Sequence, residues 1–215
     1  MNARCLALVF ALWPALAHAD DGDGVYDRFD RDLTIAADVG GGVVLDGVDA
    51  RATMTADLRF RIIDAAGPAI GLRWGPADDV GSGHGHVFIG VELRPLFPAL
   101  FLLDLSTGNE WVDLFVQSFG IELGAALFPF DDDFGIGLAV GLSMSVPLLL
   151  PSRTTGPFQS ISLRLGARRV DATASFQGAP EVDRSEWTIS AALSFAFAAR
   201  IGAASWEPPR YRLSN

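Results

Sequence analysis

The sequence predicts an all-β protein, an antiparallel up-and-down transmembrane β-barrel of about eight strands with a short helical insertion between strands 4 and 5. Three observations predict it. Apolar and polar side chains alternate with a period of two along successive segments. The polar faces carry small residues and balanced charges. The N-terminus has the pattern of a secretory signal. With 50% hydrophobic and 20% charged residues, the composition excludes a disordered chain.

Residues 1–19 predict a signal peptide. Arg4 precedes the short apolar stretch Cys5–Trp13, and Ala17–Ala19 forms an A-x-A cleavage site. The apolar stretch is too short to span a bilayer as a helix. We expect cleavage after Ala19 and export of the protein. The chain contains a single cysteine, Cys5, so the mature chain is expected to have no disulfide.

Residues 20–32 are rich in aspartate and are interpreted as an acidic N-terminal tail. Within it, Asp21–Asp27 resembles the aspartate-rich calcium loops of extracellular repeats, because carboxylates alternate with glycine. The full loop pattern is absent and there is one copy. The preferred interpretation is a solvated tail, with calcium binding left open.

The segment Arg51–Ile62 shows the strand pattern most clearly. A strand places alternate residues on opposite faces, whereas a helix would mix them. Its apolar face consists of Ala52, Met54, Ala56, Leu58, Phe60 and Ile62. Its other face consists of Arg51, Thr53, Thr55, Asp57, Arg59 and Arg61. The eight alternating segments are 33–40, 51–62, 70–74, 87–94, 121–127, 136–146, 161–166 and 187–197. The short segments 70–74 and 161–166 must extend into their flanks to cross a bilayer.

The segment Phe134–Ser152 contains no charged residue and is long enough for a transmembrane helix. From Gly135 to Val146, however, apolar residues alternate with glycine, alanine and serine, which a helix facing lipid does not require. The glycines and Pro147 also disfavour a helix. We therefore predict a strand.

Turn-forming residues separate the predicted strands. The expected turns lie at Asp46-Gly47, Gly67-Pro68, Gly75-Pro76, 129–133, 151–157 and 177–183. The exception is Pro95–Ser118, where Trp111, Leu114 and Phe115 have helical spacing. This segment is interpreted as an irregular stretch plus a short amphipathic helix, and a pair of extra strands is the alternative. The helix could pack on the core, lie on the membrane surface or cap the barrel.

Charged residues on the polar faces predict a charge network in the barrel lumen. Four acids and six bases make it nearly balanced, although the whole chain has a net charge of −10. An eight-stranded barrel has an interior just wide enough for side chains, so the charges are expected to plug it, and a narrow pore is the alternative. The predicted network consists of Asp38, Asp57, Arg59, Arg61, Arg73, Glu92, Arg94, Glu122, Arg164 and Arg168. A predicted aromatic girdle at the outer rim consists of Trp74, Phe128, Phe130, Phe134 and Trp187.

No motif predicts catalysis or a cofactor. His84 and His86 lie two residues apart in a glycine-rich segment with Ser82, and could suggest a metal site or a nucleophilic enzyme. The mature chain has no third histidine, so we interpret the segment as an external loop and expect no metal. The acidic net charge and the lack of a basic run exclude a nucleic-acid binder.

By this pattern, the chain resembles the small eight-stranded outer-membrane β-barrel proteins of Gram-negative bacteria, over 33–202. The resemblance implies outer-membrane location and lipid as partner, and it transfers no functional residue. The chain departs from the family in its C-terminal tail, 203–215, and in the long Pro95–Ser118 connection. We expect a structural or interaction role without catalysis. The alternatives are a narrow outer-membrane channel and a soluble periplasmic β-barrel that binds a lipid or apolar ligand.

Overall fold

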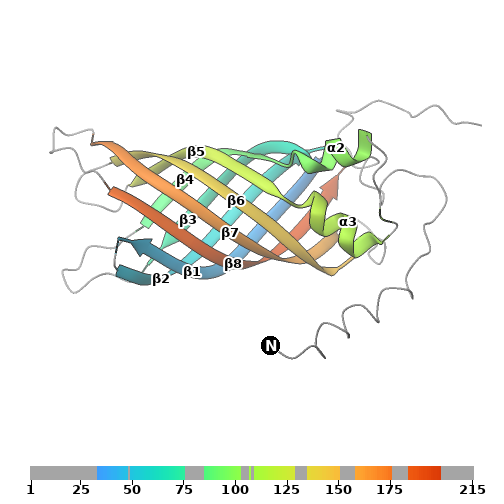
Figure 1. The fold of residues 1–215 in the computed structure, drawn as a ribbon, viewed down its shortest axis with the longest axis horizontal. Helices are drawn as coiled ribbons and strands as arrows, with labels where there is room; N and C mark the ends of the chain where they lie inside the picture. Colours follow the sequence, from blue (N-terminus) through green and yellow to red (C-terminus); the bar gives the residue numbers. More distant parts are fainter. Residues whose placement is uncertain are drawn as a thin grey trace, which may run out of the picture.

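Eight strands close into one barrel in sequence order, and each strand pairs antiparallel with its neighbours (Figure 1). This confirms the predicted fold class. The strands are β1 Leu33–Asp46, β2 Asp49–Ile62, β3 Ala66–Trp74, β4 Gly85–Leu93, β5 Gly120–Phe128, β6 Gly135–Leu149, β7 Phe158–Ser175 and β8 Arg184–Ala199. This computed structural model describes residues 33–47, 49–75, 85–102, 107, 109–128, 135–150, 158–175 and 184–199. The predicted signal peptide and both predicted tails lie outside these residues.

The barrel closes where β1 pairs with β8, from Leu33 opposite Ala199 to Leu45 opposite Trp187. Because the number of strands is even, β1 starts and β8 ends at the same end of the barrel. The helices between β4 and β5 also lie at this end, which we call the helical end (Figure 1). The β1–β2 turn at Gly47 lies at the opposite end.

Within the uncharged segment at 134–152, residues Gly135–Leu149 form strand β6, so the prediction of a strand over a helix is confirmed. The short predicted strands do extend into their flanks, since β3 has 9 residues and β7 has 18. Among the described residues, no helix is both long and apolar enough to cross a membrane.

The predicted turn at Gly67-Pro68 is wrong, because both residues lie inside β3. The chain reverses earlier, at Ile63 and Asp64, whose positive φ angles of 51° and 52° form the tight turn. Pro68 has no N–H to donate to β2. The β2–β3 ladder accordingly passes from Arg59 opposite Ala69 to Ile62 opposite Ala66, with no pair recorded between them.

The Pro95–Ser118 connection contains two helices, α2 Leu96–Leu102 and α3 Glu110–Gln117. The predicted short helix is confirmed, and the alternative of two extra strands is wrong. The Asn109 side chain starts α3 by accepting hydrogen bonds from two backbone N–H groups of the first turn. Leu114 and Gln117 are buried, whereas Phe115 and Val116 are exposed. The helix therefore packs one face against the barrel at the helical end.

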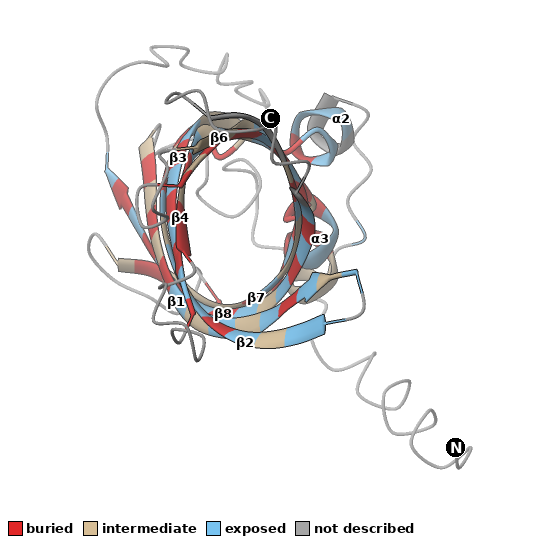
Figure 2. Cartoon of the chain, turned by 90° about the vertical axis from the view of Figure 1, so that its left-hand side faces the viewer, coloured by how far each residue is buried: buried red, intermediate tan, exposed pale blue. Residues whose placement is uncertain are grey.

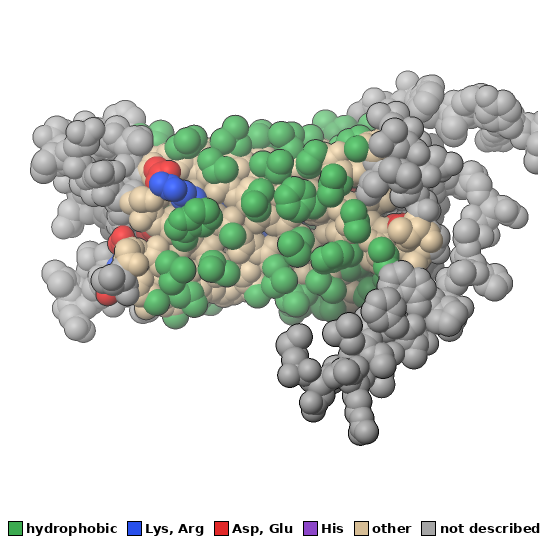
Figure 3. Space-filling view, in the orientation of Figure 1, with side chains coloured by type: hydrophobic (Ala, Val, Ile, Leu, Met, Phe, Trp, Pro, Cys, Tyr) green, Lys and Arg blue, Asp and Glu red, His purple; other side chains and the backbone are tan. Residues whose placement is uncertain are grey.

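The strands turn apolar side chains outward and polar or small side chains inward. Figure 3 shows hydrophobic side chains over most of the wall between the two ends. Met54, Leu138 and Ile189 are 60%, 52% and 53% exposed. Buried and exposed residues alternate along the strands of the barrel wall (Figure 2). The buried residues include charged ones such as Arg59 and Glu92.

A small apolar cluster occupies part of the interior. Its members come from strands β3 to β7 and are Ala69, Phe88, Ala126, Phe128, Ala139 and Val170. Phe88 fits there because Gly90 and Gly124 lie beneath its ring, where a Cβ on either glycine would approach the ring within 2.5 Å or 2.7 Å. The glycines on the inward faces thus leave room for a large aromatic side chain.

Candidate functional site: the charged barrel interior

The structure places all the charged side chains of the predicted network in the barrel interior. It adds two acids, Asp64 and Glu186, so that the ion-paired set has equal numbers of arginines and acids. The arginines are Arg59, Arg61, Arg73, Arg94, Arg164 and Arg168. The acids are Asp38, Asp57, Asp64, Glu92, Glu122 and Glu186.

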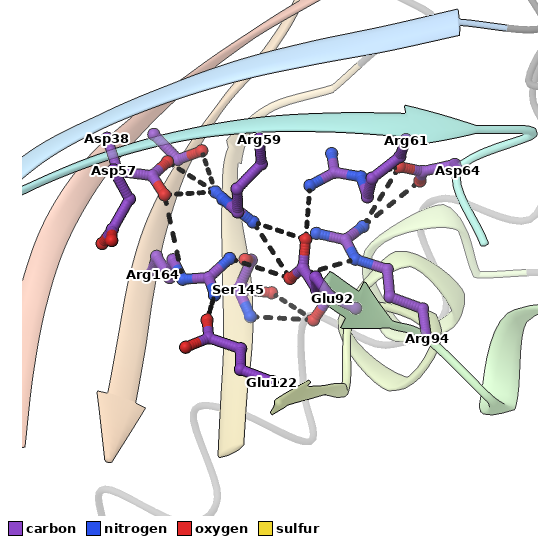
Figure 4. A network of polar contacts seen from close by, with 12 residues as sticks. Asp38, Asp57, Arg59, Arg61, Asp64, Glu92, Arg94, Glu122, Ser145 and Arg164 are labelled. Carbon is purple, nitrogen blue, oxygen red and sulfur yellow. Dashed lines mark hydrogen bonds and ion pairs between the residues drawn. The ribbon is translucent and has the colours of Figure 1, made fainter. Parts of the chain in front are cut away.

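Glu92 is the centre of this network (Figure 4). Its carboxylate lies 3.1 Å from Arg59, 3.2 Å from Arg61 and 2.9 Å from Arg164. Nε of Arg94 lies 3.7 Å away. The Glu92 side chain is fully buried. A buried carboxylate requires opposite charges and hydrogen-bond donors, and here four arginines surround it.

Arg59 and Arg164 connect Glu92 to the other walls of the barrel. Arg59 donates to the Asp38 carboxylate at 2.5 Å and to the Ser194 hydroxyl at 3.1 Å. Arg164 donates to Glu92 and to Glu122. The middle of the lumen is therefore crossed by ion pairs between strands that are not neighbours in the sheet.

Arg168 extends the network towards the opposite end. It donates to Glu122 at 2.7 Å and to Asp57 at 3.2 Å. Its guanidinium also lies over the Phe88 ring, 4.2 Å from the ring centroid. This cation–π contact joins the ion pairs to the apolar cluster.

A second group of polar residues lies at the opposite end. Arg73 pairs with Glu186 and donates to Thr188 at 2.6 Å. Nδ1 of His86 lies 3.4 Å from a Glu186 oxygen. The His86 ring is buried and packs edge-on against Phe128, with 5.5 Å between centroids.

Asp64 completes the network at the helical end. Its carboxylate accepts from Arg61 Nε at 2.6 Å and from Arg94 Nη1 at 3.2 Å. The tight turn of Ile63 and Asp64 holds this carboxylate between the two guanidinium groups.

The predicted lumen network did not include His86, Glu186 or Asp64. The alternation predicts an inward position for the first two. His86 lies on the same face of its strand as Glu92, and Glu186 lies on the same face of its strand as Thr188. The interpretation of His86 as part of an external loop is wrong, because this residue is buried in β4. Asp64 carries no such signal, because it lies in a turn.

Two small cavities lie in the part of the interior that the described residues form. One, of about 40 Å³, is lined by Arg61, Arg94 and several serines. The other, of about 20 Å³, is lined by Arg73, His86 and Arg168 among others. Side chains fill most of the remaining lumen, so neither cavity accommodates a substrate larger than a few water molecules.

The predicted aromatic girdle is only partly an outward-facing set. Trp74 and Trp187 are 53% and 46% exposed at the opposite end of the barrel. Phe128 is corrected to an interior position, because the parity of β5 turns it inward against His86. Phe130 and Phe134 lie outside the described residues.

Other sequence candidates also fall outside the description. His84, Ser82 and the Asp21–Asp27 segment are among the residues that the structure does not describe. Within the part of the chain that it does describe, no group of three or more His, Cys, Asp or Glu side chains could hold a metal ion.

Fold and interior together define a class, a closed eight-stranded up-and-down barrel with an ion-paired interior and an apolar outer wall. No protein-family model matches the chain, and no curated protein matches it. Among solved structures, the crystal structure of Neisserial surface protein A (NspA) is similar in fold, with 12% identity and a TM-score of 0.41. The match covers 76% of this chain and 96% of that chain.

Proposed function

We propose that this chain is an outer-membrane β-barrel protein with a structural or interaction role, without catalysis and without a cofactor. One observation carries the proposal. Apolar and charged side chains occupy the opposite sides from those they occupy in a soluble protein. Large apolar side chains cover the outside of a closed barrel, and ion pairs fill its inside. Such a closed wall pairs its backbone groups between neighbouring strands and presents hydrocarbon to lipid.

The strand lengths support a membrane location. A transmembrane β-strand needs about 9–11 residues. The shortest strands, β3, β4 and β5, have 9 residues each. All eight strands are therefore long enough to cross the hydrocarbon core.

The charges on the outer wall support it too. Among the described strand residues that face outward, the only charged ones are Arg169 and Asp171, which pair at 3.0 Å. They lie beside Trp187, whose ring centroid is 5.9 Å from the Arg169 guanidinium. Arginine and tryptophan together suit the membrane–water interface. The apolar belt would then run from this level to the helical end.

A soluble barrel with a bound lipid does not fit the described strands. That alternative needs apolar side chains inside, whereas Arg59, Glu92 and Glu186 are buried there. In water, the exposed apolar wall would form a patch far larger than soluble monomers carry.

The filled lumen favours a structural or interaction role over an enzyme or a transporter. The narrow channel nevertheless has an observation in its favour, the two polar cavities near either end of the charged layer. Single-channel recording in a planar bilayer separates the two roles. The structural role predicts no conductance, whereas a channel predicts conductance that changes when Arg59 or Glu92 is neutralised.

Membrane fractionation with electrophoresis of boiled and unboiled samples tests the membrane location. We expect the protein in the outer-membrane fraction, with a shift in mobility on boiling, because a closed barrel resists SDS until heated. A protein recovered without detergent as a soluble monomer, with no shift, would contradict the proposal.

A further inference from the structure

Helix α3 fills a step in the barrel wall at the helical end. The β5–β6 ladder ends where Gly120 lies opposite Ser143, and β6 continues for the six residues Met144–Leu149. At about 3.4 Å per residue, roughly 20 Å of the β6 edge extends past the start of β5. α3 contacts this strand and, with 8 residues, is about 12 Å long. It therefore covers much of the step beside the end of β6 (Figure 1).

The inner face of α3 belongs to the barrel interior. Leu114 and Ser118 line the same cavity as Ser194, an inward-facing residue of β8. Asp113 and Gln117 on this face of the helix are also buried. The inner face of α3 thus takes the place that the inward face of a strand has elsewhere in the wall.

The β6 edge beside α3 is protected at two successive backbone positions. The Ser118 hydroxyl accepts from the Ser145 N–H at 2.8 Å. Alternate residues of a strand direct their backbone groups to the same side, so Pro147 is the next residue on this edge. A proline has no N–H to leave unpaired. Neither position therefore presents a free donor, which is the condition for placing a sheet edge next to lipid.

The outward face of α3 is apolar. Trp111, Val112, Phe115 and Val116 share one side of the helix, and the last two are exposed. Neither of the two acids of α3 lies on this side, and the helix has no basic residue. A helix that lies on a membrane surface carries lysine or arginine towards the water. α3 instead has one face against the barrel and one apolar face away from it.

This apolar face continues the outer wall of the barrel. Among the described residues, α3 contacts β6 and α2, and both present large apolar side chains outward. On β6 these are Met144 and Leu148, and on α2 the first residue, Leu96, is exposed. The apolar surface thus passes from strand to helix without an intervening charge on α3.

We propose that α3 is a segment of the lipid-facing wall, with its outward face in contact with the acyl chains on the helical side of the membrane. The inference rests on the proposed function, because it needs the barrel to lie in a membrane. The helix suits this place because it satisfies its own backbone hydrogen bonds where β5 no longer pairs with β6. Its partner is lipid hydrocarbon, and the hydrocarbon layer extends past the start of β5.

Spin labelling of the full chain in lipid vesicles tests the proposal. Cys5, the single cysteine, is replaced by serine, so that an introduced cysteine carries the only label. Phe115→Cys reports on α3 and Leu123→Cys on the strand wall. Asp49→Cys, beside the β1–β2 turn, is the control in water. Oxygen concentrates in lipid and a charged nickel complex in water, so the collision rates of the label with each distinguish the two surroundings.

We expect the labels of Phe115→Cys and Leu123→Cys to collide with oxygen and to lose the nickel collisions that Asp49→Cys shows. Nickel collisions at Phe115→Cys, with Leu123→Cys in lipid, would overturn the inference and leave the proposed function intact. Loss of both kinds of collision at Phe115→Cys would show that protein covers this face, and would overturn the inference as well. Nickel collisions at Leu123→Cys would contradict the proposed function and, with it, the inference.

Trp111 provides a second measurement that needs no label. The difference in fluorescence between wild type and Trp111→Phe isolates the emission of this side chain. Brominated acyl chains quench tryptophan on contact, so we expect this difference to be lost in vesicles of brominated lipid and retained in unbrominated ones. Full retention in brominated lipid would overturn the inference. This measurement decides the question if Phe115→Cys does not fold, which the shift in mobility on boiling reveals.

Discussion

Ser118, at the end of α3, is hydrogen bonded to both backbone groups of Ser145 in β6. Its hydroxyl accepts from Ser145 N–H at 2.8 Å, and its one proton is shared between Ser145 C=O at 3.0 Å and Phe115 C=O at 2.7 Å. The last β5–β6 pair at this end is Gly120 opposite Ser143, while β6 continues to Leu149. Ser118 therefore takes the place of a missing β5 residue, and α3 covers the edge that β5 leaves. An uncovered edge in lipid would cost several kcal/mol for each unsatisfied group.

Replacement of Ser118 by alanine should destabilise the barrel by about 1–3 kcal/mol, because two buried backbone groups lose their partner. Urea unfolding of the protein in lipid vesicles measures the loss. Ser143→Ala is the matched control, because Ser143 lies in β6 two residues before Ser145. Its buried hydroxyl has no hydrogen-bond partner, so its removal should be neutral or stabilising. Equal losses in both variants would contradict the role of Ser118.

Replacement of Glu92 by glutamine should destabilise the barrel by about 3–5 kcal/mol, because several buried arginines then lose their central countercharge. The same unfolding experiment measures it. Arg169→Gln breaks an exposed pair instead and should cost about 0–1 kcal/mol. A Glu92 variant as stable as the Arg169 variant would show that the network does not stabilise the fold.

Replacement of Gly124 by alanine should cost about 1–3 kcal/mol, because the added methyl overpacks the interior. Its Cβ would lie 2.7 Å from Phe88 and 2.4 Å from the Ile89 carbonyl oxygen. Gly41→Ala is the control, since its nearest atom would be 3.3 Å away. Thermal unfolding followed by circular dichroism compares the two variants. The packing argument fails if both behave like wild type.

Replacement of the outward-facing Leu123 by arginine should destabilise the barrel in lipid by about 2–4 kcal/mol if this position lies near the bilayer midplane. Leu123 is 49% exposed on the wall. Arginine in place of the exposed Ser185, beside the Arg169 level, should cost about 0–1 kcal/mol, since the cost falls towards the interface. Folding titrations in vesicles measure both. If Leu123→Arg left the stability in vesicles unchanged, water and not lipid would surround this part of the wall.

Much of the fold could be predicted because side chains alternate between the two faces along every strand of a barrel wall. The alternation around Arg59 assigns each strand residue to a face without any knowledge of its neighbours. The errors fall where this local rule stops. Gly67-Pro68 has turn chemistry but lies in β3, because the turn was already made at Asp64. Phe128 was grouped with rim aromatics, although its parity turns it inward.

The sequence by itself determined which side chains face the two sides of the wall, because parity is a property of the chain alone. It could not determine which inward charges meet. Arg164 in β7 reaches Glu92 in β4 only because closure brings distant strands across a narrow lumen. The place of α3 along the open edge of β6 likewise depends on β5 being shorter than β6. These pairings are decided by the register and closure of the sheet, which no single segment contains.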